Sequence, residues 1–278
     1  MLRKSLAFFL LLALAACASG PREGASAVAS PPTGEPVRMA SAYPVALVNI
    51  AVDDAKTKSI AAALFEPRGT GPFPAVVILS GCAGVNPDAS VVSRVNTDYL
   101  SKGIATLVVD SFTPRGLAEV CSDSKLLTDS VAFRVRDAYA AVAWLNTRSE
   151  IDAKRIFLQG YSHGAITAIA AIDAQWPQTK SEKIAGVIAY YPYCSTNSKF
   201  SVPTIILIGE KDDWTPANLC EGIVDRANVE ITVYQNAVHA FATPGLDVVY
   251  LGHRLRYDAA ATNDGQRRAL ALIQSRSK

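Results

Sequence analysis

Long apolar runs and an excess of charge of one sign are both missing from this chain of 278 residues. A membrane-spanning helix needs about 20 consecutive apolar residues, whereas the longest such run, residues 6–17, is shorter and lies at the N-terminus. If Arg3 and Lys4 are removed with an N-terminal signal, 25 of the 27 basic residues remain against 25 acidic ones. A nucleic-acid-binding protein normally carries a basic patch, so this neutral balance argues against nucleic acid as a partner.

Metal-binding motifs are also missing. The chain has no C-x-x-C sequence and no histidine beside a pair of cysteines, so a zinc site is not expected. Of the five cysteines, four lie in the main body of the chain: Cys82, Cys121, Cys194 and Cys220. In an oxidising compartment an even number predicts two disulfides, with three possible pairings.

The N-terminus has the pattern of an export signal. Arg3 and Lys4 precede an apolar stretch of small and aliphatic residues, which is the layout of a secretory signal peptide. The stretch ends in Leu-Ala-Ala-Cys at residues 14–17, which resembles the bacterial lipobox, where the cysteine is acylated. The alternative is ordinary cleavage at an Ala-x-Ala-like site without lipidation.

We therefore expect a signal peptide at residues 1–16 and lipidation of Cys17, which would hold the protein to a membrane only through its lipid anchor. Residues 17–42 are rich in Ala, Ser, Gly and Pro and are expected to form a flexible tether. The expected location is the periplasmic side of a bacterial membrane. Ala18, where inner-membrane lipoproteins carry aspartate, favours the outer membrane by analogy with known sorting.

Residues 43–278 alternate between short β-branched apolar runs and longer amphipathic stretches, with no internal repeat or linker. This alternation predicts a single α/β domain with a mostly parallel eight-stranded sheet and helices on both faces, the first two strands forming a hairpin. The predicted strands are residues 46–52, 59–65, 75–79, 105–109, 155–159, 185–190, 204–208 and 230–234. The predicted helices are residues 89–102, 128–147, 163–175, 216–226 (with Thr215 as N-cap) and 258–275.

A G-x-S-x-G sequence at residues 160–164 lies between a predicted strand and a predicted helix. The bare pattern is weak, but a strand–turn–helix context is typical of a nucleophile elbow, in which a strained turn exposes the serine oxygen. Ser162 is therefore the candidate nucleophile. The alternative is an ordinary strand–helix turn that happens to contain a serine.

A serine nucleophile needs a general base, and the chain has only three histidines. His163 is next to the serine and is expected to be a structural or pocket residue, while His253 lies in a charged segment expected to face solvent. His239 follows the strand at residues 230–234, at the same edge of the predicted sheet as Ser162, and is the candidate base.

The acid that orients the base should follow another strand, between the serine and the histidine in chain order. Two candidates, Asp212 and Asp213, follow the strand at residues 204–208. The oxyanion needs two backbone N–H donors. We expect one from His163, directly after the nucleophile, and one from Cys82, in the glycine-containing loop at residues 80–84.

Together these segments resemble the dienelactone hydrolase family of the α/β-hydrolase fold. The resemblance covers residue 43 to the C-terminus and is carried by residues 80–84, 109–116, 160–164, 209–216 and 239–241. The family pattern G-x-x-D-x-x-x-P selects Asp212 as the acid, and Phe241 matches a phenylalanine two residues after the catalytic histidine. No metal or organic cofactor is implied.

The chain departs from the family at two positions. The enzymes that give the family its name use a cysteine nucleophile, whereas this chain has Ser162. The lactone substrate is therefore not carried over. Ser80 stands where many relatives have histidine, a change that leaves the N–H geometry of the loop possible.

The sheet order that the resemblance implies also suggests how the cysteines pair. In that order Cys82 and Cys121 follow neighbouring strands, and so do Cys194 and Cys220. This implies Cys82–Cys121 and Cys194–Cys220 disulfides that tie active-site loops together. On the same loops, Phe112, Tyr161, Trp214 and Phe241 are candidates to line an apolar pocket. Arg115 could hold a substrate carboxylate through its planar fork, or it could simply brace its loop.

The first functional prediction is a serine hydrolase that cleaves a small-molecule ester or lactone outside the cytoplasm. The second is a peptidase of the same fold, which is disfavoured because the chain has no propeller and no large cap. The third is a surface-anchored binding protein without activity. The order Ser, Asp, His argues against this third reading, because binding alone does not require all three residues.

Overall fold

The structure is a computed structural model that describes residues 44–85, 89–175 and 184–276. The predicted signal peptide, Cys17 and the tether therefore lie outside the described residues. Within the described ranges, no helix combines the length and the hydrophobicity needed to cross a membrane.

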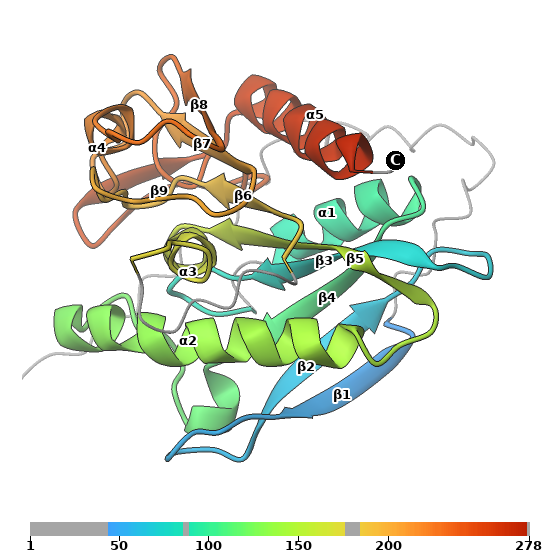
Figure 1. The fold of residues 1–278 in the computed structure, drawn as a ribbon. Helices are drawn as coiled ribbons and strands as arrows, with labels where there is room; N and C mark the ends of the chain where they lie inside the picture. Colours follow the sequence, from blue (N-terminus) through green and yellow to red (C-terminus); the bar gives the residue numbers. More distant parts are fainter. Residues whose placement is uncertain (1–43, 86–88, 176–183, 277–278) are drawn as a thin grey trace, which may run out of the picture. The chain divides into compact units, whose positions relative to one another are not determined.

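Eight strands form one twisted sheet in the order β1-β2-β4-β3-β5-β6-β7-β8 (Figure 1). β1 pairs with β2 and β2 with β4 in antiparallel register, and the remaining neighbours are parallel. The predicted fold is therefore confirmed, including the initial hairpin. The strands are β1 (Ala46–Ala51), β2 (Ser59–Phe65), β3 (Phe73–Leu79), β4 (Ala105–Asp110), β5 (Ile151–Tyr161), β6 (Gly186–Tyr190), β7 (Thr204–Gly209) and β8 (Val229–Tyr234).

Helices cover both faces of the sheet (Figure 1). One apolar core lies beneath α2 and α3, and a second lies beneath α1 and α5. Strand β3 serves both cores because its side chains alternate: Val77 points into the first core and Val76 into the second. The helices are α1 (Ala89–Leu100), α2 (Ser124–Leu145), α3 (His163–Ala170), α4 (Ala217–Glu221) and α5 (Ala259–Ser275), with a 3₁₀ turn η1 at Thr113–Arg115.

Helices α2 and α4 begin at other residues than predicted, because of the hydrogen bonds that nearby side chains make. α2 begins four residues earlier than predicted, because the Asp123 carboxylate accepts a hydrogen bond from the Leu126 N–H and caps it. Thr215 does not cap α4. Its hydroxyl contacts Asp212 instead, and Pro216 occupies the N-cap position of a helix of only five residues.

A second hairpin, β9 (Asp247–Tyr250) and β10 (His253–Arg256), was not predicted. It lies between the loop that carries His239 and helix α5 in the chain, and it joins the main body through a backbone bridge between His239 and Leu255. It forms part of the wall of the site described below.

Candidate active site

Ser162 sits on a sharp turn between β5 and α3, with φ at 49° and ψ at −116°. A non-glycine residue with positive φ is strained and is retained where the surroundings fix it. Gly160 and Gly164 make the turn possible: a Cβ on Gly160 would overlap the Gly164 carbonyl, and one on Gly164 would overlap the Leu79 carbonyl. The turn therefore has the geometry of a nucleophile elbow.

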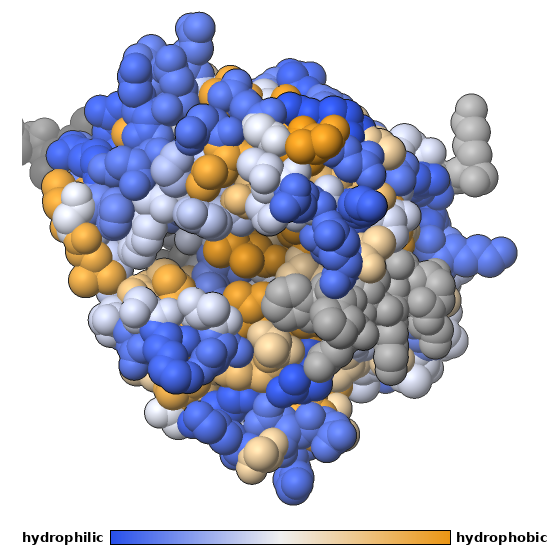
Figure 2. Space-filling view, turned by 60° about the vertical axis from the view of Figure 1, so that its left-hand side comes forward, coloured by the Kyte–Doolittle hydropathy of each residue, from blue (hydrophilic) through white to orange (hydrophobic). Residues whose placement is uncertain are grey.

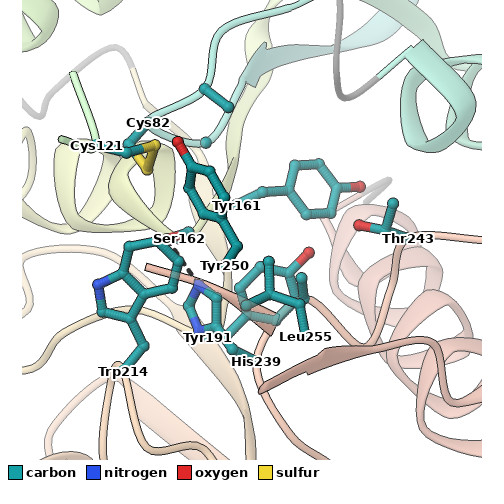
Figure 3. A pocket seen from close by; sticks show the side chains of 13 residues that line it. Cys82, Cys121, Tyr161, Ser162, Tyr191, Trp214, His239, Thr243, Tyr250 and Leu255 are labelled. Carbon is teal, nitrogen blue, oxygen red and sulfur yellow. Dashed lines mark hydrogen bonds between the residues drawn. A yellow bond between two sulfur atoms is a disulfide. The ribbon is translucent and has the colours of Figure 1, made fainter. Parts of the chain in front are cut away.

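A continuous hydrogen-bond chain runs from Ser162 through His239 to Asp212. Figure 3 shows its first link, between Ser162 and His239. The Ser162 Oγ lies 3.0 Å from His239 Nε2, and His239 Nδ1 lies 2.8 Å from Asp212 Oδ2. With the Nδ1 proton donated to the carboxylate, Nε2 is left to accept the serine proton. This is the arrangement in which an imidazole acts as general base toward a hydroxyl.

Asp212 is fixed by its own turn at the C-terminal end of β7. Its Oδ1 accepts hydrogen bonds from the N–H groups of Trp214, at 3.0 Å, and Thr215, at 2.8 Å, and the Thr215 hydroxyl lies 2.9 Å from Oδ2. The side chains of both Asp212 and His239 are buried. The side chain of the alternative acid, Asp213, is exposed and contacts His253 instead, at 3.2 Å.

The loop after β3 and the start of α3 flank the serine. Gly81 and Cys82 line the pocket beside Ser162, and His163 is the first residue of α3. The first N–H groups of a helix have no partner within the helix, so the His163 N–H remains a candidate oxyanion donor.

The side chain of His163 lies away from the pocket, in the core between α2 and α3. Arg134 Nη1 lies 2.6 Å from His163 Nδ1, and Leu127 O lies 2.7 Å from Nε2. Burial, reinforced by the Arg134 charge, lowers the pKa of His163 to about 3. The same guanidinium donates through Nη2 to the Ser80 carbonyl at 2.7 Å, so it contacts both segments that carry the expected oxyanion donors.

An open pocket leads to Ser162 at the edge of the sheet where the parallel strands end. Figure 2 shows hydrophobic residues in the hollow on this side of the molecule. The residues lining the pocket include the predicted Tyr161 and Trp214, together with Tyr191, Thr243, Tyr250 and Leu255 (Figure 3).

Four of these lining residues were not predicted from the sequence: Tyr191, Thr243, Tyr250 and Leu255. Tyr191 directly follows β6, so the rule that pocket residues follow parallel strands could have found it. Tyr250 and Leu255 belong to the unpredicted hairpin. His253 was expected to face solvent, but it stacks on Trp214 with ring centroids 4.7 Å apart.

Three residues predicted for the pocket do not line it. Phe112 is buried behind the Cys82–Cys121 disulfide, where it packs on Phe133. Phe241 is completely buried in the core beneath α5, where its ring contacts Tyr191. Both predictions were wrong because a residue on the correct loop can turn inward to fill the core instead of facing the pocket.

Arg115 is the third correction, and the structure favours its role as a loop brace. Its guanidinium binds both oxygens of Asp137, at 2.8 and 2.9 Å, and lies 3.3 Å from Asp54, with no exposed side-chain surface. Burial raises the pKa of Asp54, but hydrogen bonds from the Lys56 N–H and from Arg115 outweigh that effect and lower it to about 2. Arg115 is therefore occupied by carboxylates of the protein itself.

Both implied disulfides are present. Cys82–Cys121 joins the loops after β3 and β4 and lines the pocket. Cys194–Cys220 joins the loop after β6 to helix α4 and is buried in the same apolar core as α2 and α3. The first disulfide therefore contacts the candidate site directly, and the second is part of the core.

The sequence matches the model of the dienelactone hydrolase family over residues 60–277, which is more than half of the chain. Among curated proteins, it is 25% identical over 196 residues to a probable 2-oxo-3-(5-oxofuran-2-ylidene)propanoate lactonase of a Bradyrhizobium species, covering 64% of this chain and 77% of the relative. It is 26% identical over 215 residues to an uncharacterised protein of Mycobacterium tuberculosis, covering 70% of this chain and 73% of that one.

Solved structures share the fold. A putative dienelactone hydrolase from Klebsiella pneumoniae superposes with a TM-score of 0.62 at 21% identity, covering 82% of this chain and 99% of the other. A thermophilic esterase from Thermogutta terrifontis superposes with a TM-score of 0.60 at 14% identity, covering 83% and 92%.

Proposed function

Because the chain belongs to the dienelactone hydrolase family and is a carboxylic ester hydrolase, we propose that it cleaves a small ester or lactone with Ser162, His239 and Asp212 as its catalytic triad. The observation that carries this proposal is the buried hydrogen-bond chain from the Ser162 Oγ to the Asp212 carboxylate. One relative is a probable lactonase, and one of the solved structures that share the fold is an esterase, which supports this substrate class.

In the proposed reaction, the Ser162 oxygen attacks the substrate carbonyl while His239 Nε2 takes the serine proton. The new C–O bond gives a tetrahedral oxyanion, which the N–H groups of Cys82 and His163 stabilise. The ester C–O bond then breaks, and the departing alkoxide takes the proton from His239. Water hydrolyses the resulting acyl-enzyme by the same steps, with His239 again acting first as base and then as acid.

Asp212 has an orienting role in this scheme. Its carboxylate accepts the Nδ1 proton and so holds the imidazole with Nε2 toward the serine, and its negative charge stabilises the imidazolium that forms. Because the carboxylate is itself held by the N–H groups of Trp214 and Thr215, it is already in place before substrate binds.

The test is reaction of the purified domain with a fluorophosphonate probe, beside Ser162→Ala. We expect the probe to label the wild-type protein at Ser162 and to leave the variant unlabelled, with loss of ester and lactone hydrolysis in a substrate panel. Absence of labelling in folded protein, checked by its circular dichroism spectrum, would contradict the proposal.

We also propose that the protein is exported and anchored through a lipid on Cys17. The lipobox-like sequence supports this proposal, and so do the two disulfides, which form and persist in oxidising compartments. Metabolic labelling with a palmitate analogue in a bacterial host should mark the wild-type chain and not Cys17→Ser. Labelling of both chains, or of neither, would contradict lipidation at this position.

A further inference from the structure

The β9–β10 hairpin is held against the loop that carries His239. The Arg256 N–H donates to the His239 carbonyl at 3.2 Å, and the Tyr257 N–H donates to the Leu246 carbonyl at 2.7 Å. A backbone bridge between His239 and Leu255 adds to these contacts. The hairpin therefore has a defined position relative to the candidate base.

The two faces of the hairpin differ in polarity. Val248 pairs with Leu255 and Tyr250 pairs with His253 across the strands, and these four side chains share one face because side chains alternate along each strand. The opposite face carries Val249 with Arg254 and Arg256, and its Arg254 forms an exposed ion pair with Asp247. We call the face of Val248, Tyr250, His253 and Leu255 the inner face.

The inner face continues the wall of the pocket outward from Ser162. Tyr250 and Leu255 line the pocket itself. Trp214 connects Tyr250 to the base, with its ring centroid 5.1 Å from His239 and 6.0 Å from Tyr250 (Figure 3). Val248 lies beside Tyr250 and Leu255 on the same face, and this residue remains 44% exposed. Apart from His253, which stacks on Trp214 and lies 3.2 Å from Asp213, the inner face is apolar and extends from the candidate site toward solvent.

The pocket lacks fixed charge. None of its lining residues within the described part of the chain is Lys, Arg, Asp or Glu. Arg115 and Arg134, on the nearby loops and helix, are both buried and bonded to groups of the protein. An uncharged, apolar group fits this wall, whereas a substrate carboxylate would find no cationic partner in it.

We propose that the inner face of the hairpin is a subsite for an apolar chain of the substrate, so that the enzyme prefers uncharged esters whose acyl or alcohol group is several carbons long. This assignment rests on the proposed ester hydrolysis at Ser162. The chain would pass over Trp214 and Tyr250 and reach Val248, and each methylene buried there would favour binding of the transition state.

The test compares Val248→Asn with Val249→Asn, two adjacent positions on opposite faces of β9. Both substitutions replace valine by asparagine in the same exposed strand, so their effects on hairpin stability are matched. The readout is kcat/KM for two series: p-nitrophenyl acetate, butyrate and octanoate for the acyl side, and methyl, butyl and octyl acetate for the alcohol side.

In at least one series, we expect the wild type to have its highest kcat/KM for the ester with the longest chain. Val248→Asn should reduce the ratio of kcat/KM for the longest chain to kcat/KM for the shortest by about fivefold or more. Val249→Asn should keep the wild-type ratio. The series that responds identifies whether the acyl or the alcohol chain occupies the subsite. Unchanged ratios in both series for Val248→Asn, or equal losses in both variants, would overturn the subsite.

The proposed function and the subsite fail in different ways. If Ser162 is not labelled by fluorophosphonate and acetate esters are not cleaved, the catalytic proposal is wrong. If acetate esters are cleaved and Ser162 is labelled, but Val248→Asn leaves the chain-length ratios unchanged, only the subsite is wrong. A preference for esters bearing a carboxylate over neutral esters of equal length would also overturn the subsite.

Discussion

The guanidinium of Arg134 lies against the imidazole of His163, with Nη1 2.6 Å from Nδ1. Because an arginine side chain only donates hydrogen bonds, Nδ1 must accept, and the ring proton is therefore on Nε2, where it faces the Leu127 carbonyl at 2.7 Å. The same guanidinium donates to the Ser80 carbonyl. One buried side chain thus connects the residue after the nucleophile with the loop that carries Cys82.

Arg134 is predicted to be a positioning residue for the oxyanion donors. Arg134→Lys keeps the charge but loses the planar fork that reaches both partners, so kcat should fall about tenfold or more with KM little changed. The rate is to be expressed per fluorophosphonate-titrated site, which removes any effect of a misfolded fraction. A normal kcat per titrated site would reduce Arg134 to a purely structural role.

His163 is predicted to make stability depend on pH. Its pKa is lowered from 6.5 to about 3 in the folded protein, so between these values the unfolded chain binds a proton that the folded chain excludes. Stability therefore falls as pH decreases from about 6.5 toward 3, by about 1.4 kcal/mol per pH unit from this residue. His163→Asn, whose amide oxygen can accept from Arg134, should remove this component.

The measurement is urea unfolding at pH 7 and at about pH 4.5, for wild type and His163→Asn. The free energy of unfolding of the wild type should drop by about 2–3 kcal/mol more than that of the variant. Comparison of the two proteins cancels the carboxylates that also titrate in this window. Equal losses in both proteins would show that His163 does not carry the effect.

Asp212 and Asp213 offer a matched pair of adjacent carboxylates. Asp212→Asn should lower kcat by about three to four orders of magnitude, because an amide in place of the buried carboxylate no longer holds the correct tautomer of His239. Asp213→Asn should stay within about twofold of wild type, because its carboxylate is exposed and contacts His253 rather than His239. A reversed order of effects would assign the acid to Asp213.

The two disulfides are predicted to differ in their effect on activity. They close loops of 39 and 26 residues in sequence separation. Loss of either should therefore cost about 3–4 kcal/mol of stability by the loop-entropy estimate. Only the Cys82–Cys121 disulfide lines the pocket, so replacing this pair by serine should lower kcat per titrated site, whereas replacing Cys194 and Cys220 should not. Thermal unfolding and kcat are measured on both variants, and an equal kcat in both would contradict the prediction.

Much of the fold was readable from local pattern. The buried parallel strands β6 and β7 are largely apolar runs, and their predicted bounds differ from the observed ones by only one residue at an end. The same holds for the bounds of the half-buried edge strand β8. The G-x-S-x-G turn was readable for a related reason: close contact of strand and helix at Gly160 and Gly164 excludes a Cβ, which ties the sequence to the geometry.

Chain order and the family motifs nominated Ser162, Asp212 and His239 because the carboxyl ends of parallel strands share one edge of the sheet. The residues alone left two acids open, since Asp212 and Asp213 follow the same strand. Tertiary structure distinguishes them through the direction of each side chain. Only Asp212 turns inward, held by the N–H groups of its own turn.

Which residues line the pocket could hardly be predicted without the tertiary structure. Whether a loop residue faces the cavity or the core depends on the elements packed behind it, and for this reason Phe112 and Phe241 turned inward while Tyr191 faced the pocket. The role of Arg115 also depends on tertiary structure, because its guanidinium is bound by Asp54 and Asp137, two carboxylates distant from it in the chain. The sequence by itself determined the order of the main-sheet strands and of the helices, though not the β9–β10 hairpin, and the chemistry at the strand ends, because those depend on local periodicity and backbone sterics. Only the tertiary structure decided which side chains meet, because packing between distant segments leaves no local pattern.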